Sequence, residues 1–235
     1  MSKWGGILPI TKSEALDALG DIENCIIKPS KDSSAGIGVR SLNCNNGISY
    51  DTHESIGDII ESYRGNFVVE KKIVNCENLK VLNPSSCNTL RVHTWRNKET
   101  AQIVFVSSFL RVGRQGSIID NAFAGGIAIP LNEEGVLSNS GCTLKNYSRI
   151  EKSDTGITFR GYKIEYFDRI IDATITAHKN LPHFDFIGWD VTIDDKNEVV
   201  IIEFNPDPDM RLDQLIFMDT CLLSHQKEIL KVVYK

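Results

Sequence analysis

Hydrophobic and polar residues alternate most clearly near the C-terminus, from residue 186 to residue 209 (FIGWDVTIDDKNEVVIIEFNPDPD). Alternation with a period of two is typical of a strand that has one buried face. Residues 194–197, Asp-Asp-Lys-Asn, carry the turn chemistry that reverses a chain between two strands. The pattern therefore predicts an antiparallel hairpin made of strands 186–193 and 198–205.

Three oxygen-bearing side chains are placed on one face of this hairpin by the same alternation. Glu203 and Asn205 share a face of the second strand, and Val200 lies on the other face. With the strands paired across the turn, Asp190 lies opposite Ile201 and diagonal to Glu203, on the face that carries Glu203. We therefore expect Asp190, Glu203 and Asn205 to converge.

Two carboxylates and an amide within hydrophobic runs point to a bound cation. Buried carboxylates are costly unless a positive charge meets them, and oxygen ligands suit a hard ion such as Mg²⁺ that also binds phosphate. We expect hydrophobic residues of both strands to enclose the set: Trp189, Val191, Val200, Ile202 and Phe204. The alternative is that these are solvated acidic residues at the wet end of a strand.

The rest of the chain alternates between strand-like and helix-like segments. The hydrophobic pattern predicts strands at residues 25–28, 39–42, 48–50, 66–74, 88–97 and 101–112 and helices up to residue 19 and at 53–63, 165–180 and about 211–233. Thr11 and Glu14 form a capping box for the first helix, and Gly20 is expected to end it in the left-handed conformation. Asp51 or Thr52 is expected to cap the second helix.

A loop of small residues, SKDSSAGIG, joins the first two predicted strands. It lacks the G-x-x-x-x-G-K-[ST] spacing and the following helix of a P-loop. Its glycines and hydroxyl groups can still approach phosphate oxygens, and Lys28 adds a positive charge from the preceding strand. The candidate phosphate-binding residues here are Ser33, Ser34, Gly36 and Gly38. The alternative is a hairpin tip that binds nothing.

The strand at 101–112 ends in a second polar segment, which contains Arg111, Arg114, Asp120 and Asn121. So many charged and amide groups within a short span exceed the needs of a turn, and we expect them to line an anion-binding pocket. The alternative is that each is a solvated loop residue. His93 lies on a predicted strand, where a histidine is more often structural, so we leave it out of the site.

Composition and charge exclude several classes of function. The chain has 235 residues, is 41% hydrophobic and carries a formal charge of −5. Without a cluster of Lys and Arg, nucleic acid is not an expected partner. No apolar run is long enough for a membrane span and the N-terminus lacks a signal-peptide core, so we expect a cytoplasmic protein. Six cysteines at scattered spacings are expected to be reduced thiols. The oligomeric state is not indicated.

The sequence motifs, and their order along the chain, resemble those of the ATP-grasp superfamily, most closely its sugar-transfer-associated family. The resemblance runs from about Gly6 to Asp209 and is carried by IIKPS with SSAGIGV, LNPSSCNTLRVHT, FLRVGRQGSIIDNAFAGGIAIP, and GWDV with IIEFNPDPD. It implies an α+β fold of mostly antiparallel sheets, in which two subdomains, here 1–70 and 71–235, clasp a nucleotide. Family members carry an upstream domain and a further lysine before the IIKPS strand. Only residues 1–27 precede Lys28 here, so a truncated clasp is expected.

The resemblance also implies roles for individual residues. Lys28 and the Ser33–Gly38 loop would contact phosphates, and the strand that carries Glu70 and Lys71 would bind adenine. Arg91 would face the γ-phosphate or an acyl phosphate and, with Lys28, form the catalytic pair. Glu77 and Asn78 are candidates for binding ribose.

The resemblance further implies the cofactors and the reaction. Asp190, Glu203 and Asn205 match the family's magnesium ligands, with Glu203 bridging two Mg²⁺ ions; Mn²⁺ is an alternative metal. The implied reaction is ATP-dependent ligation of a carboxylate to an amine through an acyl phosphate, on small-molecule, sugar-linked or peptide-linked substrates, in surface polysaccharide or sugar-conjugate biosynthesis. The alternatives are a nucleotide-binding module without turnover and an ATP-grasp kinase.

Overall fold

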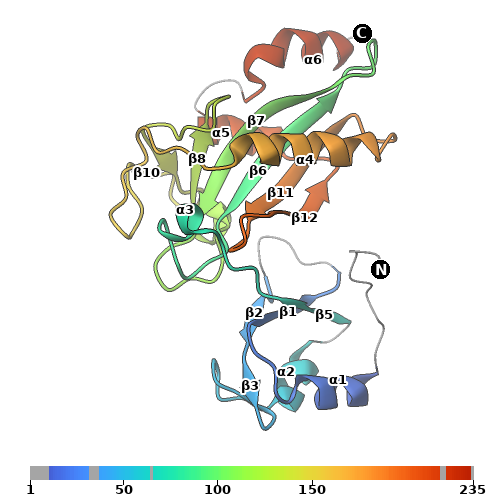
Figure 1. Cartoon of the computed structure of the whole chain (residues 1–235), viewed down its shortest axis with the longest axis vertical. Helices are drawn as coiled ribbons and strands as arrows, with labels where there is room; N and C mark the ends of the chain where they lie inside the picture. Colours follow the sequence, from blue (N-terminus) through green and yellow to red (C-terminus); the bar gives the residue numbers. More distant parts are fainter. Residues whose placement is uncertain (1–10, 32–36, 64–65, 218–220, 234–235) are drawn as a thin grey trace. The chain divides into compact units, whose positions relative to one another are not determined.

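The computed structural model describes residues 11–31, 37–63, 66–217 and 221–233. The chain divides into two compact units, Met1–Lys72 and Ile73–Lys235, and each has its own sheet and hydrophobic core (Figure 1). The boundary expected between residues 70 and 71 falls inside β5 (Phe67–Lys71), the last strand of the first unit.

The first unit contains a three-stranded antiparallel sheet with the order β2-β1-β5. Besides β5, the strands of this sheet are β1 (Cys25–Pro29) and β2 (Arg40–Leu42). The unit also contains the hairpin of β3 (Cys44–Asn45) and β4 (Ile48–Ser49) and the helices α1 (Lys12–Leu19) and α2 (Ile56–Ser62). Ile27 of β1 and Leu42 of β2 are fully buried beside Ile59 of α2. The apolar stripes of both helices therefore cover one face of this sheet.

The capping box that Thr11 and Glu14 were expected to form is confirmed, but two other predictions about these helices are wrong. Gly20 has φ −62°, a right-handed value, and its carbonyl accepts a hydrogen bond from Gly47 N. Helix α2 begins at Ile56 and is capped by Ser55, whose hydroxyl accepts from Asp58 N. His53 has φ +60°, so the helix cannot begin there.

The second unit contains a seven-stranded sheet with the order β10-β9-β8-β7-β6-β11-β12 (Figure 1). Its strands are β6 (Thr89–Arg96), β7 (Ile103–Val112), β8 (Ile127–Leu131), β9 (Gly141–Cys142), β10 (Arg149–Ile150), β11 (Phe186–Ile193) and β12 (Val199–Asn205). Its helices are α3 (Glu77–Lys80), α4 (Phe167–Lys179), α5 (Met210–Phe217) and α6 (Gln226–Val233), with 3-10 turns at Ala122–Ala124 and Leu223–His225. Its strand pairings are antiparallel, which confirms the predicted α+β class.

Helix α4 lies across the strands of this sheet and closes one face (Figure 1). Phe167 and Ile170 of α4 belong to the same buried cluster as Leu90, Leu110 and Ile187 of the central strands. Because side chains alternate along a strand, the intervening residues of these strands point to the opposite face. That face carries the polar residues described below.

The single closing helix expected at about residues 211–233 is wrong, because the chain forms α5, a 3-10 turn and α6 instead. Ile216 of α5 is buried with Phe109 and Leu144, whereas Ile229 of α6 is buried with Trp95 and with other residues at the far end of β6 and β7. Two short helices bury these separate hydrophobic patches. Tertiary packing therefore overrides the continuous helical pattern of the sequence.

The hairpin of β11 and β12 is present, but its register differs from the prediction. Asp190 lies directly opposite Glu203, and the next pair is Val191 with Ile201, so a bulge occurs at Ile202. The extra residue reverses the alternation, and Val200, opposite Thr192, shares the face of Asp190. The expected enclosure is also wrong for β12, because this edge strand leaves Ile202 and Phe204 exposed.

Two further sequence expectations concern the cysteines and the membrane. All six cysteines are free thiols, and five of them are buried, which agrees with the reduced thiols that were expected. Burial raises the pKa of the Cys221 thiol to about 11. Among the described residues, no helix has both the length and the apolar character needed to cross a membrane.

Candidate active site

Three charged residues form a row across the strands of the second unit. Arg91 of β6 lies opposite Asp190 of β11, which in turn lies opposite Glu203 of β12. The Arg91 guanidinium donates to both carboxylate oxygens of Asp190, with 2.6 Å from Nε to Oδ1 and 3.3 Å from Nη2 to Oδ2. The three side chains therefore lie next to one another on one face of the sheet. This is the face that the sequence predicted for Asp190 and Glu203.

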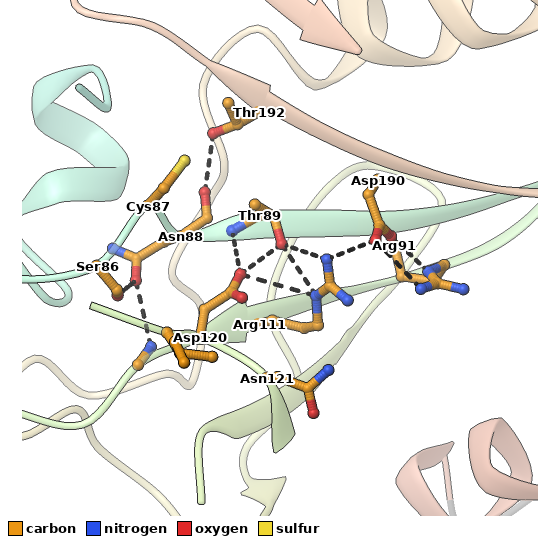
Figure 2. A network of polar contacts seen from close by, with 12 residues as sticks. Ser86, Cys87, Asn88, Thr89, Arg91, Arg111, Asp120, Asn121, Asp190 and Thr192 are labelled. Atoms are coloured by element: carbon orange, nitrogen blue, oxygen red, sulfur yellow. Dashed lines mark hydrogen bonds and ion pairs between the residues drawn. The ribbon is translucent and has the colours of Figure 1, made fainter. Parts of the chain in front are cut away.

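A second arginine joins this row from β7 (Figure 2). Arg111 Nη2 lies 2.9 Å from Asp190 Oδ2, and its Nε and Nη2 donate to Thr89 Oγ1 at 2.9 and 2.7 Å. The Thr89 hydroxyl in turn donates to Asp120 Oδ2 at 2.5 Å. The carboxylates of Asp120 and Asp190 thus lie on either side of the Arg111 guanidinium, and we call these six residues the charge network: Thr89, Arg91, Arg111, Asp120, Asp190 and Glu203.

Burial and charge shift the pKa values of this network in opposite directions. Burial alone would raise the pKa of Asp190, which is 4% exposed, but Arg111 and Arg91 outweigh it and lower the pKa. Burial and the neighbouring charge of Asp190 raise the pKa of Glu203. Burial also raises the pKa of Asp120, against the opposing charge of Arg111. Arg111 and Arg91 offset only part of the repulsion that arises when Glu203 ionises beside Asp190.

That repulsion fits a cation site. The network holds three carboxyl groups and two guanidinium groups, so its fully ionised form has an excess negative charge. Within the described part of the chain, no group of three or more Asp, Glu, His or Cys side chains forms a complete metal site. A bound ion would therefore need Asn205 and water or phosphate oxygens beside Asp190 and Glu203, which is how Mg²⁺ is commonly held.

Asn205, the third predicted ligand, lies opposite Gly188 at the end of β12. Its Nδ2 approaches Gly188 O at 3.5 Å. A Cβ atom at position 188 would come within 3.2 Å of Arg91 Nη1 and 3.1 Å of Pro208 Cβ. The absence of a side chain at Gly188 thus allows Arg91 and the Pro208 turn to lie close to β11.

Of the four polar residues expected to line a pocket at the end of β7, Arg111 and Asp120 enter the charge network. Asn121 caps the 3-10 turn Ala122–Ala124, where its Oδ1 accepts from Phe123 N. In Figure 2 it is drawn without a contact to the charge network. Arg114 binds Asp154 at 2.8 Å and not the network. Thr89, which binds Asp120 and Arg111, also belongs to the network and was missed in the sequence reading.

A buried group of amides and hydroxyls fixes the start of β6. Asn88 donates through Nδ2 to Leu79 O and Asn83 O, both at 2.9 Å, and accepts through Oδ1 from Ser86 Oγ and Gly113 N. Its backbone carbonyl also accepts from Thr192 Oγ1 (Figure 2). The motif LNPSSCNTLR is therefore a scaffold that holds the strands carrying Arg91 and Arg111.

His93 is on the same face of β6 but has structural contacts. Its ring is buried, with Nδ1 3.2 Å from Ser107 Oγ and Nε2 3.1 Å from Asp213 Oδ2 of α5. It also stacks on Phe186. These contacts join α5 to the sheet, in keeping with the structural role expected for this histidine.

The candidate residues of the first unit are only partly described. Lys28 of β1 forms an ion pair with Glu70 of β5, with 2.6 Å between Nζ and Oε2, and both side chains are partly exposed. Lys71, at the end of β5, is exposed. Gly38 has φ +77° and accepts a hydrogen bond from Tyr63 Oη through its carbonyl. Three further candidates lie outside the described residues: Ser33, Ser34 and Gly36.

The two ribose candidates differ in their environment. Asn78 uses its whole amide to hold the segment before α4, since Nδ2 donates to Lys163 O and Oδ1 accepts from Glu165 N. Glu77 has a side chain that is 79% exposed and only a distant contact with Lys80, at 3.9 Å. Glu77 is therefore the better placed of the two to meet a ligand.

The sequence matches one protein-family model over most of its length. The model of the family described as "Sugar-transfer associated ATP-grasp" matches residues 10–229. The chain belongs to that family. Its ATP-grasp membership, predicted from the four motifs, is thereby confirmed. Among curated proteins, none matches the sequence.

Solved structures similar to this ATP-grasp chain share little sequence with it. N5-carboxyaminoimidazole ribonucleotide synthetase from Thermotoga maritima has 13% identity and a TM-score of 0.44, with 86% of this chain and 36% of that chain covered. The Staphylococcus aureus N5-carboxyaminoimidazole synthetase complexed with ADP has 15% identity and a TM-score of 0.46, with coverage of 90% and 44%. The ATP-grasp ligase PsnB, complexed with minimal precursor, Mg and ADP, has 14% identity and a TM-score of 0.47, with coverage of 94% and 49%. The chain spans less than half the length of each.

Proposed function

We propose that this chain catalyses ATP-dependent ligation of a carboxylate to an amine or a related nucleophile through an acyl phosphate. The observation that carries the proposal is the row of Arg91, Asp190 and Glu203, in which two close carboxyl groups and a fork-shaped cation share one face of the sheet. Family membership supports the use of ATP. Phosphoryl transfer needs positioning and charge neutralisation more than a protein nucleophile, and this row supplies both.

Asp190, Glu203 and Asn205 would hold magnesium, with Glu203 shared between two ions; manganese has the same oxygen preference. Bound magnesium would neutralise phosphate charge. For Asp190 to take part, its oxygens must exchange arginine contacts for the ion, which leaves Arg91 able to bind a phosphate oxygen with its planar fork.

The remaining nucleotide contacts in this proposal come from the family resemblance. Lys28 would bind phosphates after release from Glu70, assisted by the loop of Ser33, Ser34, Gly36 and Gly38. Glu70 and Lys71 would meet adenine, and Glu77 would meet ribose. Arg111, which the sequence reading placed among the ligand contacts, is buried between carboxylates, so its contact with the nucleotide would be indirect.

In the proposed reaction, a substrate carboxylate oxygen attacks the γ-phosphorus of ATP and the bond to the β-phosphate oxygen breaks. ADP leaves, and an acyl phosphate forms. The amine then attacks the acyl carbon, loses a proton, and inorganic phosphate leaves as the amide bond forms. Arg91 would stabilise the charge on the transferred phosphoryl group at the first step.

Single-turnover assays with Mg-ATP and a panel of carboxylates test this function. Hydroxylamine should trap an acyl hydroxamate while ADP forms, and Glu203→Ala should abolish both signals without unfolding the chain. ADP formation without hydroxamate would favour a kinase. Tight Mg-ATP binding without ADP would favour a nucleotide-binding module without turnover. An unchanged rate of ADP release in Glu203→Ala would disprove the role of Glu203.

The substrate class and the cellular setting remain part of the proposal. The family description suggests a sugar-linked acceptor, in surface polysaccharide or sugar-conjugate biosynthesis, and a peptide-linked acceptor has the same carboxylate and amine chemistry. A cytoplasmic location would supply both ATP and magnesium. Activity on sugar-linked carboxylates but not on free amino acids in the same assay would support the first class.

A further inference from the structure

Asp120 is not one of the proposed metal ligands, but Thr89 and Arg111 connect it to the ligand Asp190. Its Oδ2 accepts hydrogen bonds from Thr89 N at 3.0 Å and from Thr89 Oγ1 at 2.5 Å, and lies 3.7 Å from Arg111 Nε. Arg111 in turn contacts Asp190. Both side chains of the Arg111–Asp120 pair are nearly buried, at 11% and 13% exposure, so water screens this chain of contacts only weakly.

The backbone around Asp120 is held in one position. A Cβ atom on Gly126 would lie 2.1 Å from Asp120 O, so only glycine fits where the chain returns to β8. Gly126 N donates to Asn121 O at 3.0 Å and closes this turn. The Asp120 carboxylate therefore meets Thr89 and Arg111 in a fixed geometry and not as a mobile surface charge.

We infer that Asp120 is a positioning residue for the metal-binding Asp190 and acts on it through Arg111 and Thr89. The inference rests on the proposed role of Asp190. Arg111 divides its positive charge between two carboxylates, and Thr89 accepts two of its hydrogen bonds. Without Asp120, the whole charge of Arg111 acts on Asp190 and competes with an incoming cation for the same oxygen. Asp120 thus leaves Asp190 available to the ion.

Manganese binding to the full-length chain, without nucleotide, tests this directly. Electron paramagnetic resonance of free Mn²⁺ gives the dissociation constant for the parental chain and for Asp120→Asn. We expect Asp120→Asn to weaken binding by about 10-fold or more, as is usual when a group that orients a metal ligand is changed. Asp190→Asn should abolish binding at the site.

A matched control comes from Asp154, a carboxylate from another loop that binds the same polar segment. Asp154 accepts from Arg114 Nε and from Gln115 N, both at 2.8 Å, and anchors the loop without touching the charge network. Asp154→Asn should destabilise the loop as Asp120→Asn does, but leave the manganese affinity unchanged. Equal affinities for these two variants would overturn the inference and leave the metal site intact.

Two substitutions at Thr89 keep the test decisive if Asp120→Asn fails to fold. Thr89→Ser keeps the hydroxyl and should bind manganese like the parental chain, whereas Thr89→Val removes the acceptor of Arg111 and should bind more weakly. Equal binding by both would overturn the inference. If the parental chain and Asp190→Asn bind manganese equally, the proposed metal site itself is wrong, and the role of Asp120 falls with it.

Discussion

Asp190 and Glu203 face each other directly across β11 and β12, so their two carboxyl groups lie side by side on one face of the sheet. Burial and the charge of Asp190 raise the pKa of Glu203 above its ordinary value of 4.5. The folded chain therefore holds the Glu203 proton more tightly than the unfolded chain does. Stability falls as the pH rises from 4.5 through the raised pKa, because ionised Glu203 then repels Asp190.

The first prediction concerns Glu203→Gln, which keeps a hydrogen-bond donor and removes the ionisable group. We expect the variant to have a higher melting temperature than the parental chain at pH 7 in the absence of metal. It should also lose turnover by about 100-fold or more, because a ligand for the ion is missing. Differential scanning calorimetry in EDTA and an ADP-release assay measure the two effects.

Glu198→Gln serves as the control for that prediction. Glu198 is exposed, lies just before β12 and contacts Arg169 at 3.5 Å. Its substitution should change neither the melting temperature nor turnover measurably. A lower melting temperature for Glu203→Gln without metal would contradict the repulsion between Glu203 and Asp190.

The second prediction concerns Gly188, where a side chain would crowd Arg91. A methyl group there would lie 3.2 Å from Arg91 Nη1 and 3.3 Å from Arg91 Cδ, so the arginine must move. Gly188→Ala should therefore lower kcat by about 10-fold or more, since small displacements of a positioning group are costly. The free energy of unfolding should fall by only about 1 kcal/mol. Steady-state kinetics and urea denaturation separate the two quantities.

Gly57→Ala provides a matched change of glycine to alanine far from the charge network. Gly57 lies in the first turn of α2, and an added Cβ would meet Ser55 Oγ only at 3.6 Å, an ordinary contact. We expect this variant to be stabilised by about 0.5 kcal/mol with kcat unchanged. If both glycine variants behave alike in kcat, the crowding of Arg91 has no catalytic consequence.

The sequence predicted the hairpin ligands because alternation is a local property. Asp190 and Glu203 were assigned to one face, and they share it, but their direct pairing depends on the bulge at Ile202. Nothing in the hydrophobic pattern marks that bulge. The neighbouring Val200 was therefore assigned to the wrong face.

Contacts between distant segments were harder to foresee. Asp120 reaches Thr89 across 31 positions because the segment after β7 folds back toward the start of β6. Composition indicated that this segment was polar, but not which of Asp120 and Asn121 would face inward. Arg91 was identified because its motif resembles a family motif, whereas Thr89, two residues earlier in that motif, has no chemical signal of its own.

The third prediction concerns pH and His178, a fully buried histidine on α4. Its Nε2 donates to Phe184 O at 2.9 Å, because a carbonyl can only accept, so Nδ1 accepts from Thr94 Oγ1 at 2.7 Å. Trp189 Nε1 completes the relay by donating to Thr94 Oγ1. A second proton on His178 would force the Thr94 hydroxyl to turn and accept from Nδ1, and burial lowers the pKa of the ring below its ordinary value of 6.5.

The sign of the effect follows from the lowered pKa. Above pH 6.5 the ring is neutral in both states and adds no pH dependence. Below it the unfolded chain binds the proton first, so the free energy of unfolding falls by up to about 1.4 kcal/mol per pH unit until the folded-state pKa is reached. His178→Gln should remove this part of the slope in urea denaturations between pH 5 and 7, while His183→Gln, at an exposed position, should retain it. If the slope persists in His178→Gln, groups other than His178 cause the pH dependence.

The fourth prediction concerns Asn88, whose amide makes four hydrogen bonds in a buried position. Asn88→Asp keeps the shape but turns the amide nitrogen, which donates to Leu79 O and Asn83 O, into an oxygen that faces two carbonyl groups. We expect a loss of about 3 kcal/mol or more in the free energy of unfolding, because each unsatisfied buried group costs about 1–3 kcal/mol. Urea denaturation of the Asn88→Asp variant and of the parental chain measures this loss.

Asn180→Asp is the matched comparison for Asn88→Asp, since Asn180 is exposed and its side-chain amide donates to Thr176 O at 3.2 Å. It should cost less than about 0.5 kcal/mol. Because Asn88 also accepts from Gly113 N, beside the strand that carries Arg111, the folded fraction of Asn88→Asp should bind manganese more weakly than Asn180→Asp. Equal stability of the two variants would show that the amide group at the start of β6 does not hold the strands of the charge network.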